Sequence, residues 1–207
     1  YTLPAYQTAS GCVDILMHTM ERYFTKAENT MLTDSVAEGL MRTVIYNAKV
    51  LAEDPENYDA RAQVMWAGSL SHGCGTEGDW ASHQLEHELG GMFDVAHGAG
   101  LAAVWGSWAR YVYKEKPARF AQFAANVFNI PWNSSNLEQM ALDGIQAMEA
   151  FYRSIHMPTS LAELGVNPTE EQIQELAKKC SFMGKRTVGT FKVLQIPDME
   201  AIYRMAR

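Results

Sequence analysis

At 207 residues, with 47% hydrophobic and 20% charged side chains, the chain is long enough to bury a core and has the composition of a globular protein. Its net charge of -7 argues against a nucleic-acid partner, because binding to phosphates requires concentrated lysine and arginine. The longest uncharged apolar run, residues 100–109, is about half the length needed to span a bilayer, so no membrane partner is expected.

Cysteine usage points to a reducing compartment. Cys12, Cys74 and Cys180 are odd in number and widely spaced, and the chain contains no C-x-x-C motif. Such spacing fits reduced thiols better than a disulfide framework, and no secretory signal is recognised. We therefore expect a cytoplasmic protein.

Helical periodicity dominates the chain. An apolar stripe through Leu32, Val36, Leu40, Val44 and Ala48, widened by Ala37, Met41 and Ile45, predicts a helix with one buried face. A helix beginning near Trp80 follows, and a further helix over residues 137–152 comes after Ser134 and Ser135, which can supply an N-cap.

The last third of the chain carries the clearest helix-start signals. Thr169 to Gln172 reads as a capping box, and Pro197 with Asp198 opens a last short helix. Residues 191–196, "FKVLQI", are the one strand-like candidate. We expect an all-α fold of roughly seven to nine helices in a single domain, residues 1–207.

The glycine-rich segment "GCGTEG", residues 73–78, matches the dinucleotide-binding pattern G-x-G-x-x-G. That pattern requires a preceding strand, because only then do the glycines bring the backbone to a pyrophosphate at a helix N-terminus. The residues before it have helical spacing. We therefore interpret the segment as a helix-to-helix connection.

Two segments carry pairs of metal-ligand residue types four positions apart. Asp14 with His18, and His83 with His87, each share one face of a helix. Either pair alone is weak evidence for a metal. Asp14, however, lies in the apolar stretch 13–17, where an unpaired charge would be costly, so a cation is expected there.

The segment from His83 to His87 also spells H-x-x-E-H, the inverted signature of zinc peptidases. In that alternative, His83 and His87 hold zinc, Glu86 activates water, and the third ligand is a downstream acid such as Glu138, Glu149 or Glu163. A two-histidine, one-carboxylate oxygenase and a non-catalytic helical scaffold are further alternatives. Mixed carboxylate and imidazole ligands suit either Zn²⁺ or Fe²⁺.

Two longer patterns resemble the signatures of the iron-containing (group III) alcohol dehydrogenases. The first is matched by Pro4, Ala9, Gly11, Asp14, Ile15, Leu16 and Glu21. The second is matched by Trp80, Ser82, His83, Glu86, His87, Leu89, Gly90, Gly91, Val95, His97, Gly98 and Gly100. Residues 79–105 especially resemble the butanol dehydrogenase branch, which includes aldehyde reductases that prefer NADPH.

The resemblance implies roles for individual residues. It implies one divalent metal, Fe²⁺ or Zn²⁺, held by Asp14, His18, His83 and His97. It makes His87 an unligated histidine beside the substrate and the nicotinamide, and a candidate proton relay. Trp80 is expected at the substrate pocket because it is close to His83. Glu86 is expected to have a structural role behind the metal ligands and not to act as a catalytic base.

The resemblance also implies a missing partner domain. These enzymes bind NAD(H) or NADP(H) mainly in an N-terminal α/β domain with a glycine-rich loop, and no such segment occurs here. The chain is expected to be the helical C-terminal domain of the dehydroquinate synthase-like, iron-containing alcohol dehydrogenase fold. It would act on a small alcohol or aldehyde only together with the cofactor domain, and a homodimer is a further expectation.

Overall fold

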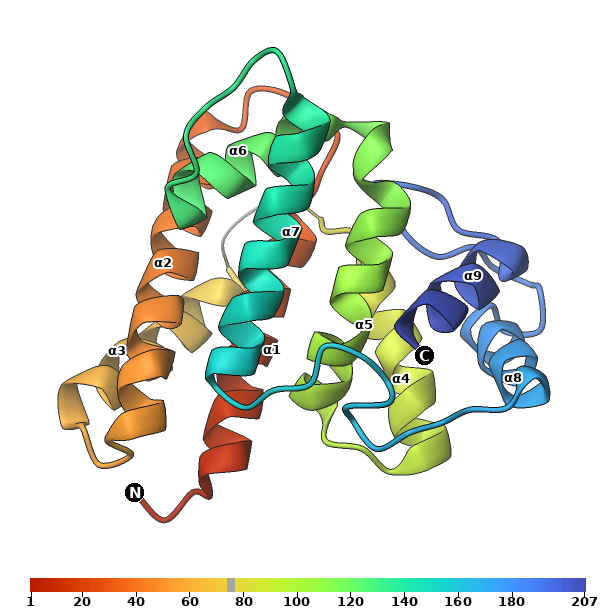
Figure 1. Ribbon diagram of the computed structural model, residues 1–207, viewed down its shortest axis with the longest axis horizontal. Coiled ribbons are helices and arrows are strands. Elements are labelled where there is room, and N and C mark those ends of the chain that lie inside the picture. The colour runs from red at the N-terminus through yellow and green to blue at the C-terminus, as the bar shows by residue number, and fades with distance from the viewer. Residues whose placement is uncertain (74–76) are drawn as a thin grey trace.

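The computed structural model describes residues 1–73 and 77–207. In these residues the chain forms nine α-helices and one 3-10 helix (Figure 1). They are α1 (Ala5–Tyr23), α2 (Met31–Glu53), α3 (Tyr58–Ser71), α4 (Ala81–Phe93), α5 (His97–Val112), η1 (Tyr113–Glu115), α6 (Pro117–Phe128), α7 (Leu137–Ser154), α8 (Glu170–Cys180) and α9 (Ile196–Ala206). The all-α prediction is confirmed.

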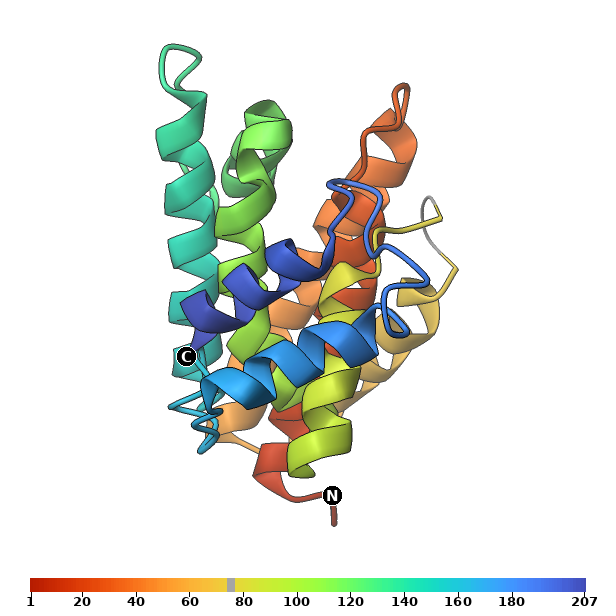
Figure 2. The same cartoon turned by 90° about the vertical axis from the view of Figure 1, so that its right-hand side faces the viewer.

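The arrangement places α1 and α5 side by side in the interior. In Figure 1, α2 and α3 lie to one side of them and α8 and α9 to the other. Figure 2 shows α8 and α9 crossing the outer face of α4 and α5. The apolar helix α5 is buried along most of its length, with Trp105 and Trp108 among the largest enclosed side chains. Because α1, α4 and α5 pack on one another, residues far apart in the sequence meet between them.

The buried face predicted for α2 is confirmed in its later turns and wrong at its start. Leu40, Val44 and Ala48 are buried, whereas Leu32 is 76% exposed and Val36 is 41% exposed. A 3.6-residue period identifies side chains that share a face, but it does not specify how far along that face a neighbouring helix extends.

Helix starts were predicted with mixed success. The capping box of Thr169 and Gln172 is present at α8, and Pro197 lies in the first turn of α9. Ser134 and Ser135 do not cap α7. Its N-cap is Asn136, whose side chain accepts a hydrogen bond from the backbone N–H of Gln139 at 3.1 Å.

The strand-like segment 191–196 does not form a strand. Among the described residues, pairing is limited to one antiparallel bridge between Val188 and Leu194. Phe191 and Leu194 are fully buried in the core, whereas Val193 is 55% exposed. None of the described helices combines the length and the apolar composition needed to cross a membrane.

Candidate metal centre

The central feature of the candidate site is a cluster of three side chains from three helices. Asp14 lies on α1, His83 on α4, and His97 is the first residue of α5. Asp14 Oδ1 is 3.4 Å from Nε2 of His83 and 3.4 Å from Nε2 of His97. The three ligand atoms all lie within 4.8 Å of one another. One small cation could therefore contact all three.

Unpartnered polar atoms accumulate at this cluster. Asp14 Oδ1 and His83 Nε2 are both buried and have no hydrogen-bond partner among the described residues, although they face each other. Buried polar atoms without a partner are rare because they lose solvation without compensation. A carboxylate oxygen and two imidazole nitrogens form a donor set that suits Zn²⁺ or Fe²⁺. The residues present therefore fit a divalent metal.

A sharp chain reversal brings His97 into the cluster. Helix α4 ends at Asp94, which has a left-handed backbone with φ of 53°, and α5 begins three residues later. A Cβ atom on Gly98 would lie 2.0 Å from the carbonyl oxygen of Ser10. Only glycine permits this contact, so the start of α5 lies directly against the backbone of α1, next to Asp14.

The pKa values of Asp14 and of the histidines around it depend strongly on one another. Burial alone would raise the pKa of the Asp14 carboxyl, but His18, His83 and His97 hold that pKa well below its usual range. Contacts with Asp14 and Glu86 raise the pKa of His97 to about 10. The pocket therefore strongly favours positive charge next to Asp14, as a cation site would.

His18 lies beside the cluster without joining its group of three ligand atoms. Its Nδ1 is 2.9 Å from the carbonyl oxygen of Asp14 and 3.2 Å from Asp14 Oδ1. Because a carbonyl can only accept, Nδ1 carries the proton in that bond and Nε2 keeps its lone pair. The ring centroid of His18 is 4.6 Å from that of His83.

The wall next to His18 is aromatic. Trp80 precedes α4 with φ of 62°, an uncommon conformation for a bulky residue, and its ring lies 5.4 Å from that of His83. The guanidinium of Arg22 lies 4.5 Å from the Trp80 ring centroid. His72, directly after α3, has its ring centroid 4.3 Å from that of His18. Its neighbourhood could not be read from the sequence because it depends on the packing of α3 against α1.

His87 occupies the open side of the site. Its side chain is exposed, and its ring stacks on His97 with centroids 5.4 Å apart and an interplanar angle of 30°. Partial desolvation and the neighbouring imidazoles of His97 and His83 lower the pKa of His87. Ligand atoms of Glu86, His87 and His97 form a second close group, but no group found among the described residues contains both His83 and His87.

Two buried glutamates stand behind the histidine ligand candidates. Glu21 Oε1 accepts from the backbone N–H of His83 at 3.1 Å and lies 3.2 Å from its Nδ1. Glu86 Oε2 forms a short hydrogen bond with Nδ1 of His97. The contact made by Glu21 was not anticipated from the sequence. Its spacing of seven residues from Asp14, two helical turns, was the available signal.

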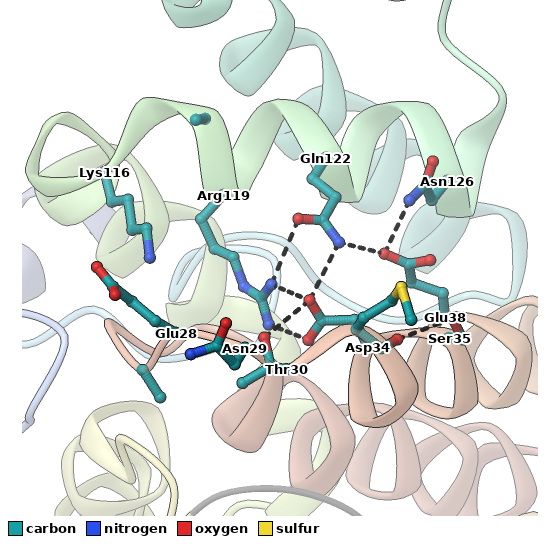
Figure 3. Close-up of a pocket in the computed structure, with 13 residues that line it drawn as sticks. Glu28, Asn29, Thr30, Asp34, Ser35, Glu38, Lys116, Arg119, Gln122 and Asn126 are labelled. Carbon is teal, nitrogen blue, oxygen red and sulfur yellow. Dashed lines mark hydrogen bonds and ion pairs between the residues drawn. The ribbon is translucent and has the colours of Figure 1, made fainter.

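A separate hollow of about 550 Å³ lies between the start of α2 and α6 (Figure 3). Arg119 bonds both carboxylate oxygens of Asp34 at 2.5 and 2.6 Å. Gln122 and Asn126 both donate to Glu38, at 2.8 and 2.9 Å. In the described part of the chain, none of the buried polar atoms that lack a hydrogen bond lines this hollow. Its network stabilises the contact between two helices.

Half of the glycine-rich segment 73–78 lies outside the described residues, since 74–76 are not among them. The chain before it is helix α3, as predicted, and not the strand that a dinucleotide-binding loop requires.

Comparison with known proteins gives the family. A sequence model of the Fe-containing alcohol dehydrogenase family, C-terminal, matches residues 8–207. The chain belongs to this family. It is 32% identical to the NADH-dependent butanol dehydrogenase A of Clostridium acetobutylicum over 209 residues, which are 99% of this chain and 53% of that protein. It is 35% identical to the NADPH-dependent aldehyde reductase YqhD of Escherichia coli over 211 residues, which are 100% of this chain and 54% of that protein.

Solved structures of this family share the fold. The substrate- and cofactor-free form of the E. coli aldehyde reductase YqhD superposes with a TM-score of 0.91 at 34% identity, covering 100% of this chain and 55% of that one. The butanol dehydrogenase A of Thermotoga maritima gives 0.90 at 32% identity, covering 99% and 53%. The family member described here therefore spans about half the length of the relatives it matches. These comparisons give the peptidase and scaffold alternatives no support.

Proposed function

We propose that this chain forms the metal-binding and substrate-binding half of an NAD(P)-dependent alcohol dehydrogenase or aldehyde reductase. The observation that carries the proposal is that Asp14 Oδ1 faces Nε2 of both His83 and His97 and has no hydrogen-bond partner in the part of the chain that the structure describes. Family membership supports it, as do relatives named for NADH-dependent butanol dehydrogenation and NADPH-dependent aldehyde reduction.

The proposed ligands are Asp14, His18, His83 and His97. Three of them already present their ligand atoms to one point, and His18 keeps the lone pair of Nε2 because its Nδ1 donates to the backbone. Three imidazoles and one carboxylate leave a bound dication with net positive charge. Such an ion, Fe²⁺ or Zn²⁺, supplies a Lewis acid for the oxygen of an alcohol or aldehyde.

His87 and Trp80 are proposed to act on the substrate side. His87 lies at the open face with its ring stacked on His97, so it can exchange a proton with water and with a substrate oxygen next to the ligands. Trp80 lies against His18 and His83 and closes one side of the same space. In the oxidation direction the alcohol gives a hydride to NAD(P)⁺ and a proton through His87 to solvent.

The whole enzyme requires groups that this chain does not supply. We propose that NAD(H) or NADP(H) is bound mainly by an α/β cofactor domain of the same protein, in line with the half-length coverage of the relatives. The chain alone should then lack dehydrogenase activity. A homodimer remains a proposal, and so does a cytoplasmic location, which fits the free buried thiols of Cys12 and Cys180.

Metal quantification after removal of one imidazole tests the ligand assignment. The protein should bind one equivalent of Zn²⁺ or Fe²⁺, His97→Ala should lose most of it, and His87→Ala should retain it. The peptidase alternative predicts the reverse, because it makes His87 a ligand and gives His97 no role. Equal stoichiometry and affinity in His97→Ala and the unmodified protein would refute our assignment.

A further inference from the structure

The glutamate inside H-x-x-E-H points to a neighbouring helix. Glu86 is 1% exposed, and its Oε2 forms a short hydrogen bond with Nδ1 of His97 at the start of α5. Ligand atoms of Glu86, His87 and His97 lie within 4.8 Å of one another, but among the described residues no such group joins Glu86 to His83. The hydrogen bond of the carboxylate goes to His97, a histidine to which the peptidase alternative gives no role.

The bond from Glu86 determines which nitrogen His97 offers. In the neutral ring a carboxylate accepts the proton on Nδ1, and the lone pair is then on Nε2, the atom that lies 3.4 Å from Asp14 Oδ1. A carboxylate behind an imidazole also raises the basicity of the ring and fixes its orientation. The tautomer and the ring orientation of His97 therefore both depend on the side chain of Glu86.

The carboxylate of Glu86 occupies a space that depends on the absence of a side chain at Gly100, and one of its oxygens lacks a hydrogen bond to the described residues. A Cβ atom on Gly100 would lie 2.6 Å from Glu86 Oε1 and 2.8 Å from its Cγ, so a larger residue there would displace the carboxylate. Glu86 Oε1 is buried, and residues 1–73 and 77–207 offer it no hydrogen-bond partner. A half-satisfied buried carboxylate is destabilising for the fold, which argues that its position serves the site.

We propose that Glu86 is the positioning residue for His97, and that Gly100 provides the space in which Glu86 reaches it. This inference rests on the proposed function, because it gives His97 its role as a metal ligand. Glu86 acts through His97 and touches neither the substrate nor the metal.

Zn²⁺ affinity, measured by competition with a chromophoric chelator, tests the proposal. Glu86→Ala should weaken Zn²⁺ binding about 10- to 100-fold, the usual effect of removing a carboxylate behind a histidine ligand. Glu86→Gln should lose less, because its amide oxygen still accepts from Nδ1. Glu88→Gln is the matched control on the same helix and should bind Zn²⁺ like the unmodified protein.

A double-mutant cycle tests the part played by Gly100. Gly100→Ala should weaken Zn²⁺ binding when Glu86 is present and add little in the Glu86→Ala background, because the nearest atoms to the new methyl group belong to Glu86. The absorption spectrum of bound Co²⁺ should change in Glu86→Ala and remain unchanged in Glu88→Gln. A purely structural role would lower the melting temperature without altering that spectrum.

The outcomes separate the two proposals. If the unmodified protein did not bind one equivalent of Zn²⁺, the proposed function and this inference would both fail. If it bound Zn²⁺ through His97 and Glu86→Ala kept the full affinity and the same Co²⁺ spectrum, only the inference would fail. An equal loss from Gly100→Ala in both backgrounds would refute the role of Gly100.

Discussion

The contact between Gly98 and Ser10 gives the sharpest prediction that links packing to the site. A methyl group on Gly98 would lie 2.0 Å from a backbone oxygen, and real Cβ atoms essentially never come within 3.0 Å of another heavy atom. In Gly98→Ala the backbones of α1 and α5 must therefore separate by about 1 Å, because neither side is a flexible side chain. We expect a loss of about 3 kcal/mol, the upper end of the usual range for overpacking.

The same displacement should weaken metal binding. His97 immediately precedes Gly98, and Asp14 lies one turn of α1 beyond Ser10, so separating the backbones moves two proposed ligands apart. We expect a melting temperature lower by roughly 6–12 °C and Zn²⁺ affinity reduced about tenfold or more. Thermal unfolding by circular dichroism and the chelator competition measure the two effects.

Gly11→Ala provides the control for this experiment. Gly11 neighbours Ser10 on α1, but a Cβ atom there would meet nothing within 4 Å. Replacing an unencumbered helical glycine should raise stability by about 0.5–1 kcal/mol and leave Zn²⁺ binding unchanged. If Gly98→Ala proved as stable as Gly11→Ala and bound Zn²⁺ equally well, the contact with Ser10 would not position α5.

Three further predictions concern other parts of the molecule. Asp34→Asn breaks the buried pair with Arg119 and should cost about 3 kcal/mol at pH 7 in denaturant titrations. Although burial raises the pKa of Asp34, Arg119 lowers it overall from 3.8, so the pair stabilises above that pH. The difference between Asp34→Asn and the unmodified protein should therefore shrink as the pH falls below 3.8, and a constant difference would contradict this origin. In the full-length enzyme, His87→Ala should lower kcat about 100-fold with metal content intact, and unchanged kcat would exclude the relay role. Trp80→Ala should raise KM more than it lowers kcat, and a KM equal to that of the unmodified enzyme would place Trp80 outside the substrate pocket.

The local parts of this fold were accessible from the sequence. The capping box at Thr169 and the apolar periods of α2 and α7 arise from interactions within one or two helical turns, which sequence spacing records directly. The exposure of Leu32 was not accessible, because it depends on where another helix ends. The hydrogen bond from His83 to Glu21 joins residues 62 positions apart and likewise depends on how α1 packs against α4.

The peptidase and dehydrogenase interpretations of H-x-x-E-H differ in which histidines they expect to be buried together. Spacing alone puts His83 and His87 on one face of α4, but the N-terminal part of α4 lies against α1, so His83 is 5% exposed while His87 remains open to solvent. Their ring centroids are 6.2 Å apart, and His97 lies 5.4 Å from each of them. Asp14 approaches from α1 and meets His83 and His97. The packing of α1 and α5 against α4, and not the spacing within the motif, therefore determines which imidazoles face the carboxylate of Asp14. The same packing directs Glu86 at His97.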